Sequence, residues 1–205
     1  MLRRYSAPHF DYPGTGGELA RHLLDKFELH EVNVERAATQ GDHYDPQAKA
    51  VRLTPDKLDG RSLTAVVAAA HEVGHALQDH LGYEPLQWRN RLVVMAQRAE
   101  RVGAGIMMVL PLVALITRSP VAGGVTFLVG LVSISSMAIV HLVTLPVELD
   151  ASFNRALPLL RAGRFIAVED ERDARRILQA CALTYLASSL AGLLNVWRWL
   201  RLWRK

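Results

Sequence analysis

The residues best suited to chemistry are two histidines and a glutamate in the pattern H-E-x-x-H, found at His71, Glu72 and His75. Histidines four positions apart lie on one face of an α-helix, so both imidazoles can bind one zinc ion from the same side. Glu72 is then expected beside the metal, where its carboxylate can take a proton from a zinc-bound water. The pattern predicts a zinc-dependent metalloendopeptidase with Glu72 as the general base.

The sequence around this pattern favours a metal site over the alternative of two structural histidines. The nine residues before it are apolar and mostly small, as in a helix that is buried on most sides. We expect the active-site helix to span 62–81, with Ser62 or Thr64 as its N-cap and Gly82 near its end. Gly74 costs about 1 kcal/mol relative to alanine within a helix, which indicates close packing or substrate approach at that point.

A catalytic zinc site needs a third protein ligand and keeps one position open. Glu148 is the best candidate, because it lies where a long apolar segment meets polar sequence and Pro146 distorts the helix just before it. An acidic residue at such a boundary is often functional, although an ordinary boundary carboxylate is the alternative. Asp150 is the second candidate ligand, and fits better as the acceptor for the outer N–H of a ligating histidine. We expect one Zn²⁺ per chain.

Three further residues are candidates for stabilising the oxyanion that forms during hydrolysis. His43 and Tyr44 lie in an expected turn before a short strand, where the alternative role is to stabilise the turn. His141 lies seven residues, or about two turns, before Glu148 and therefore on the same helix face.

Apolar stretches dominate the second half of the chain, and hydrophobic residues make up 50% of the whole. No Asp, Glu, Lys or Arg occurs within 102–117, 119–147 or 177–197. The second and third stretches reach the ~20 residues that a membrane-spanning helix needs, and the first is marginal because it is shorter and contains Pro111. These stretches predict transmembrane helices, with buried core helices as the alternative.

The fold class that follows is mainly α: a small α/β zincin-like domain with the H-E-x-x-H helix, joined to a transmembrane helical bundle. Residues 1–101 are expected to form the soluble zincin-like part and residues 102–147 a transmembrane helical hairpin. Residues 148–205 then hold the third-ligand segment, a charged helix and the last apolar helix. Within the first part, the patterns predict a helix at 18–27 and short strands at 30–36 and 50–53.

Charge and cysteine content limit the partners. The net charge of +4 comes largely from arginines that flank apolar segments, which indicates contact with a lipid bilayer and no nucleic acid. The arginines between residues 89 and 101 indicate that the zinc site faces the cytoplasm, because basic residues flank membrane helices on that side. Three membrane-spanning helices would, however, put the basic C-terminal tail on the opposite side, against the same rule. The orientation in the membrane therefore stays open. Cys181 is the single cysteine, which excludes an intramolecular disulfide and a cysteine-based zinc site.

Five segments resemble a bacterial family, the membrane zinc metallopeptidases that are also called neutral zinc metallopeptidases. They read GTGGELARHLL (14–24), DHYDPQAKAVRLT (42–54), AAAHEVGHALQ (68–78), TLPVELDAS (144–152) and ALTYLASSLAGLL (182–194). The resemblance implies a gluzincin-like site in which His71, His75 and Glu148 bind zinc and Glu72 is the base. It also implies a multi-pass protein of the prokaryotic cell membrane that acts on protein or peptide substrates.

The site is more distantly similar to that of HtpX-type and prenyl-protein membrane proteases. In those families an aspartate commonly follows the third ligand by four residues, whereas this chain has Ser152 there. This departure leaves the hydrogen-bond partner of the histidines open. The main alternative to an enzyme is a non-catalytic zinc-binding scaffold or partner protein, and whether the chain forms an oligomer is also open.

Overall fold

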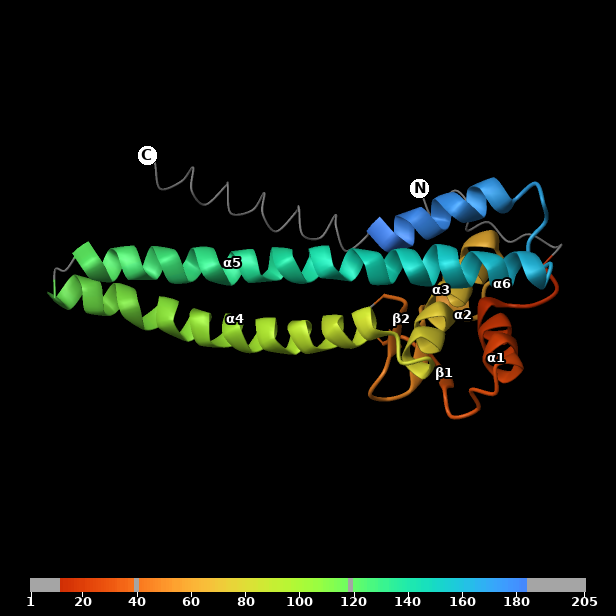
Figure 1. Ribbon diagram of the computed structural model, residues 1–205, viewed down its shortest axis with the longest axis horizontal. Coiled ribbons are helices and arrows are strands. Elements are labelled where there is room, and N and C mark those ends of the chain that lie inside the picture. The colour runs from red at the N-terminus through yellow and green to blue at the C-terminus, as the bar shows by residue number, and fades with distance from the viewer. Residues whose placement is uncertain (1–11, 39–40, 118–119, 184–205) are drawn as a thin grey trace. The chain divides into compact units, whose positions relative to one another are not determined.

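The computed structural model describes residues 12–38, 41–117 and 120–183, which divide between two units (Figure 1). The first unit comprises the described residues within 1–83 and 146–184, and it contains the H-E-x-x-H pattern. In the second unit, the described residues belong to helix α4 (Glu84–Thr117) and to helix α5 (Pro120–Leu149) as far as residue 145.

Helix α1 (Gly16–Lys26) begins where the sequence places turn residues. The hydroxyl of Thr15 accepts a hydrogen bond from the backbone N–H of Glu18, and the Glu18 carboxylate accepts one from the N–H of Thr15, at 3.1 and 2.7 Å. This capping box satisfies two N–H groups that a helix start otherwise leaves unpaired. The helix buries Leu19, Leu23 and Leu24 in the core, as the predicted amphipathic pattern requires.

A three-stranded sheet follows, built from β1 (Asn33–Arg36), β2 (His43–Asp45) and β3 (Ala50–Leu53). Strand β3 is central: it pairs in parallel with β1 and antiparallel with β2. Strands β1 and β3 lie within the predicted ranges. Strand β2 occupies sequence that we interpreted as a turn, because its Gly, Asp and Pro residues flank the three-residue strand and mask it.

Helix α3 (Leu63–His80) carries the H-E-x-x-H pattern through the middle of the first unit, after the short helix α2 (Pro55–Leu58). The Ser62 hydroxyl caps its start by accepting from the N–H of Ala65 at 3.2 Å, so Ser62 is the N-cap. Residues 63–78 are all buried, which explains the small apolar side chains of that segment. The helix ends at His80, and Gly82 follows its C-cap Leu81 with a φ of 64°, a left-handed conformation that glycine adopts without strain.

A π-helical segment, η2 (Asp150–Ala156), continues directly from α5 and leads into α6 (Leu157–Ala162). Pro146 lies within α5, where it lacks the N–H that a regular helix turn uses. Segment η2 packs against α3. Residues 171–183 are helical again, and Ile177 and Leu178 complete the core with residues from α1, α3 and α6.

The predicted transmembrane helical bundle is wrong. Among the described residues, no helix combines the length and the apolarity that crossing a membrane requires. The prediction rested on the absence of charged residues within the three stretches, and residues 119–147 also contain glycines, serines, threonines and His141. The same finding corrects the predicted multi-pass location in the cell membrane and the cytoplasmic placement derived from it. Most of the stretch 177–197 lies outside the described residues.

Helix α3 and segment η2 lie very close to each other at Gly74. A Cβ atom added at Gly74 would lie 2.7 Å from the carbonyl oxygen of Ala151. Because this oxygen belongs to the backbone, it cannot move aside as a flexible side chain could. We expect Gly74→Ala to lower the free energy of unfolding by about 1–2 kcal/mol, because the overlap outweighs the gain in helix propensity.

Urea unfolding of the full chain measures this effect, with Gly105→Ala as the matched control. A methyl group added at Gly105, in α4, meets no atom within 4 Å, so that variant should be unchanged or more stable by up to about 1 kcal/mol. Equal stability of the two variants would contradict the close approach.

Candidate metal centre

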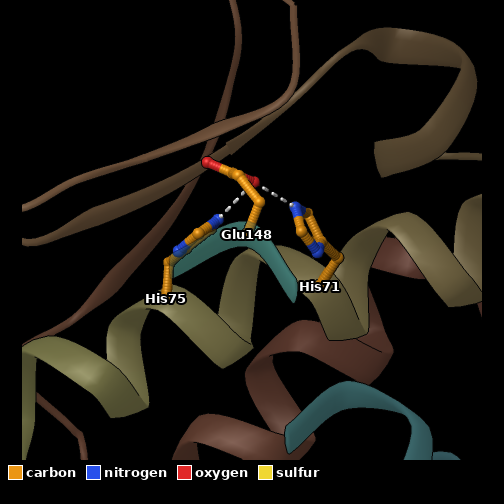
Figure 2. A group of neighbouring side chains, drawn as sticks. All are labelled: His71, His75 and Glu148. Atoms are coloured by element: carbon orange, nitrogen blue, oxygen red, sulfur yellow. Dashed lines mark hydrogen bonds and ion pairs between the residues drawn. The ribbon is translucent and has the colours of Figure 1, made fainter. Parts of the chain in front are cut away.

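Three side chains from two distant parts of the chain converge in the first unit (Figure 2). His71 and His75 project from the same face of α3, and Glu148 reaches them from the last turn of α5. One carboxylate oxygen of Glu148, Oε2, lies 3.2 Å from the Nε2 atom of each histidine. The two imidazole rings are 4.8 Å apart and nearly perpendicular. The arrangement places two nitrogen donors and one oxygen donor around a common point.

All three side chains are buried, and Glu148 has no exposed surface. Burial by itself would raise the pKa of the Glu148 carboxyl, but the imidazoles of His75 and His71 outweigh it and hold that pKa well below its usual range. Glu148 is therefore a carboxylate. A buried carboxylate beside two nitrogen donors is a ligand set that a divalent cation can occupy.

The outer nitrogen of His71 is held by Ser152, on η2. The Ser152 Oγ atom lies 3.1 Å from His71 Nδ1 and 3.4 Å from the carbonyl oxygen of Leu178. A carbonyl oxygen only accepts hydrogen bonds, so the hydroxyl hydrogen is donated to Leu178 and Oγ accepts from His71 Nδ1–H. This tautomer leaves a lone pair on Nε2, the atom that faces Glu148, as metal binding requires.

Glu72 lies between the two histidines in sequence and is also buried. Burial raises the pKa of its carboxyl to about 7, with the nearby carboxylates of Glu148 and Asp42 adding to the rise. The His71 imidazole and a hydrogen bond from the backbone N–H of Tyr44 act in the opposite direction. A carboxyl group that titrates near neutrality can both accept and return a proton.

Asp150 does not contact the histidines in the way we predicted. Its carboxylate accepts hydrogen bonds from the side chains of Gln78, Asn154 and Arg155, at 2.8, 2.9 and 2.8 Å. Gln78 stands between Asp150 and the site, since its Oε1 atom lies 2.9 Å from His75 Nδ1. Asp150 thus reaches the metal centre through an intervening amide.

Two of the three candidates for oxyanion stabilisation, Tyr44 and His43, have other hydrogen-bond partners. The Tyr44 hydroxyl donates to Asp79 Oδ2 at 2.8 Å, an oxygen that also accepts from Lys49 at 2.6 Å. His43 precedes Tyr44 in β2, so its side chain lies on the opposite face of the sheet, where Nδ1 is 2.8 Å from the Gly41 carbonyl oxygen. His141 is in α5, in the second unit, and its side chain lies outside the described residues.

Two polar residues of the site were not predicted as partners of the histidines: Gln78, and Ser152, whose position was noted only as lacking the aspartate of related proteases. Each lies about one helical turn after a candidate ligand, Gln78 three residues after His75 and Ser152 four after Glu148. That spacing was the available signal, because residues three and four apart share a helix face. It was missed because amides and hydroxyls are common on helices, whereas the carboxylate of Asp150 is the more usual partner of a ligating histidine.

Comparison with known proteins agrees with this chemistry. A family model described as "Putative neutral zinc metallopeptidase" matches residues 1–204. The chain belongs to this family. A relative from Bacillus subtilis (strain 168), named "Putative membrane protease YugP", is 35% identical over 198 residues, which cover 96% of this chain and 84% of the relative. No solved structure matches the chain significantly. The resemblance to the neutral zinc metallopeptidases is confirmed.

Replacement of Ser152 tests how the candidate ligand His71 is held. We expect Ser152→Ala to raise the dissociation constant for zinc about 10–100-fold, because His71 Nδ1–H loses its acceptor and the ring loses its fixed tautomer. Competition with a chromophoric chelator measures the constant. Thr144→Ala is the matched control, since it removes another buried hydroxyl that donates to backbone, in the second unit. Equal zinc affinities of the two variants would contradict the role of Ser152 in holding His71.

Proposed function

We propose that this member of the neutral zinc metallopeptidase family hydrolyses peptide bonds with zinc held by His71, His75 and Glu148. The observation that carries the proposal is the convergence of two Nε2 atoms and Oε2 of Glu148, with 3.2 Å from Oε2 to each nitrogen. Imidazole nitrogens that carry a lone pair and a carboxylate oxygen are all acceptors, so they repel one another unless a cation lies among them. Family membership supports zinc as that cation.

The donor set fits a catalytic zinc ion better than a structural one. Structural zinc sites are closed by four protein ligands, whereas catalytic sites use three and leave a position open. Among the described residues, the group that can hold a metal consists of His71, His75 and Glu148. The Nδ1 atoms of both histidines face polar partners, Ser152 and Gln78, which is how ligating histidines are usually oriented.

Each protein residue then has a defined task in hydrolysis. Bound zinc supplies the Lewis acidity that activates water and polarises the substrate carbonyl. Glu72 takes the proton of the attacking water on its carboxylate and delivers it to the leaving amine. Burial of Glu72 keeps bulk water away from this proton transfer. His71, His75 and Glu148 hold their positions through the contacts between α3, η2 and the end of α5.

Strand β2 is the element best placed to bind an extended substrate. It is an edge strand, whereas β3 is central. The backbone N–H of Tyr44, in the middle of β2, forms a hydrogen bond with the Glu72 carboxylate, so this strand borders the proposed base. An extended peptide can add to such an edge through backbone hydrogen bonds. The strand is anchored by Tyr44, whose hydroxyl donates to Asp79 on α3.

Zinc content and peptide hydrolysis together test the proposal. We expect the purified chain to bind zinc, Glu148→Gln to lose most of it, and Glu72→Gln to retain it. Hydrolysis of a quenched fluorescent peptide library should fall at least about 10²-fold in Glu72→Gln, because the general base is lost while zinc remains. Elemental analysis and fluorescence measure the two quantities.

Glu84→Gln is the control, because Glu84 is exposed at the start of α4 in the second unit. Removal of zinc with a chelator should abolish hydrolysis, and added zinc should restore it. Zinc binding without hydrolysis of any peptide would favour a non-catalytic zinc-binding scaffold. Undiminished hydrolysis in Glu72→Gln would refute the assignment of the base.

A further inference from the structure

Gln78 is buried completely and lies one turn after His75, at the end of helix α3. Its side-chain amide makes three hydrogen bonds. The Oε1 atom lies 2.9 Å from His75 Nδ1, and the Nε2 atom lies 2.8 Å from the Val147 carbonyl oxygen and 2.8 Å from Asp150 Oδ2. The Gln78 amide therefore links His75, a candidate zinc ligand on α3, to Val147 and Asp150, which lie before and after Glu148 in the sequence.

Counting donors and acceptors settles the orientation of this amide. The backbone carbonyl of Val147 can only accept, and the Asp150 carboxylate already accepts from Arg155 and Asn154. The two hydrogens of the Gln78 amide nitrogen are therefore both donated to these oxygens. The amide cannot turn over without losing both bonds, so Oε1 must face His75. Because Oε1 only accepts, Nδ1 of His75 must carry a hydrogen.

The groups that hold Gln78 are themselves fixed. Arg155 donates its Nε–H to the same oxygen of Asp150, at 2.8 Å, and its guanidinium lies over the ring of Tyr83 at 5.5 Å from the centroid. The N–H of Tyr83 donates back to the Gln78 carbonyl oxygen at 2.9 Å, which closes the end of α3 in a Schellman-type turn through Gly82. These contacts form a closed ring from Gln78 through Asp150, Arg155 and Tyr83 back to Gln78.

We propose that Gln78 is a positioning residue that keeps the hydrogen of His75 on Nδ1, and that Asp150 and Arg155 act on the metal centre only through the Gln78 amide. The functional meaning of this arrangement rests on the proposed zinc site. With Nδ1 protonated, the Nε2 lone pair of His75 points toward Glu148 and is available to a metal ion.

Loss of Gln78 permits a competing arrangement. A ring without an acceptor at Nδ1 can carry its hydrogen on Nε2 and donate it to Glu148 Oε2, which is 3.2 Å away. That hydrogen bond would occupy the point where the three donors converge. Gln78 thus disfavours a proton at the place where the metal binds, and through Val147 it also holds the backbone next to Glu148.

Nitrogen-15 NMR of the full chain, labelled at histidine, tests this proposal directly. Spectra of the metal-free protein are recorded well above the ordinary histidine pKa of about 6.5. We expect the wild-type His75 Nδ1 to be protonated, and a substantial fraction of Gln78→Leu molecules to carry the hydrogen on Nε2 instead. An unprotonated Nδ1 in the wild type would overturn the proposal without any variant, so a failure of Gln78→Leu to fold does not remove the test.

Two further variants separate positioning from stability. Gln78→Glu restores an acceptor for Nδ1–H but cannot donate to Val147 and Asp150, so Nδ1 should be protonated again while zinc binding stays weak. Gln47→Leu, at an exposed turn position, is the matched control and should resemble the wild type. Gln78→Leu should raise the zinc dissociation constant about 10–100-fold, measured by chelator competition.

A Gln78→Leu protein with protonated Nδ1 and wild-type zinc affinity would refute the proposal. Failure of the proposed peptidase activity would be seen separately, as absent hydrolysis in a wild-type chain whose His75 tautomer is still as expected. The tautomer measurement needs neither zinc nor substrate, so the two proposals fail independently.

Discussion

The structure depends on one interaction above all, the burial of the Glu148 carboxylate against the two histidines of α3. An ionised carboxylate taken out of water is costly unless positive charge or hydrogen bonds compensate it. In this site both Nε2 atoms lie 3.2 Å from one oxygen of that carboxylate. Because the outer nitrogens of both rings face groups that accept their hydrogens, the inner nitrogens present lone pairs to the carboxylate. A cation among these three atoms would compensate the carboxylate, and this donor set suits a divalent metal ion.

The fold around this cluster is organised to bring two helical segments unusually close. Gly74 removes the side chain that would strike the carbonyl oxygen of Ala151, and it does so between the two histidines, where separation would matter most. The π-helical segment η2 begins directly after Leu149 and presents Ser152 to His71, while Glu148 in the preceding turn faces both rings. Widened turns of this kind occur frequently at functional sites, because they change which side chains share a face. The packing of α3 against η2 therefore also positions the candidate ligands and Ser152.

The sequence was sufficient to predict the helix that carries His71 and His75 and the strands β1 and β3, because each has a local pattern, and it narrowed the N-cap of that helix to Ser62 or Thr64. Glu148 was proposed from the need for a third ligand and from its place at the end of an apolar segment after Pro146, and no pattern links it to His75, since 73 residues separate them. Strand β2 was missed because three residues carry too little periodicity to distinguish a strand from a turn. The membrane prediction rested on the absence of charge within three stretches, and no described helix meets the requirement for crossing a membrane. The network around Gln78 was beyond prediction, since it depends on where η2 lies against α3, which only the fold determines.

The choice of partners for the outer histidine nitrogens has an electrostatic consequence. A carboxylate in that position raises the basicity of the imidazole and passes negative charge toward the metal. This chain uses a hydroxyl on His71 and an amide on His75, which orient the rings without that charge. The carboxylate of Asp150 is separated from His75 by the Gln78 amide, and Arg155 forms an ion pair with that carboxylate at 2.8 Å. Asp150 therefore helps to orient His75 through the Gln78 amide, while Arg155 neutralises the negative charge of the Asp150 carboxylate. A divalent ion at this centre would keep more of its positive charge, and it is this charge that activates water and polarises a carbonyl.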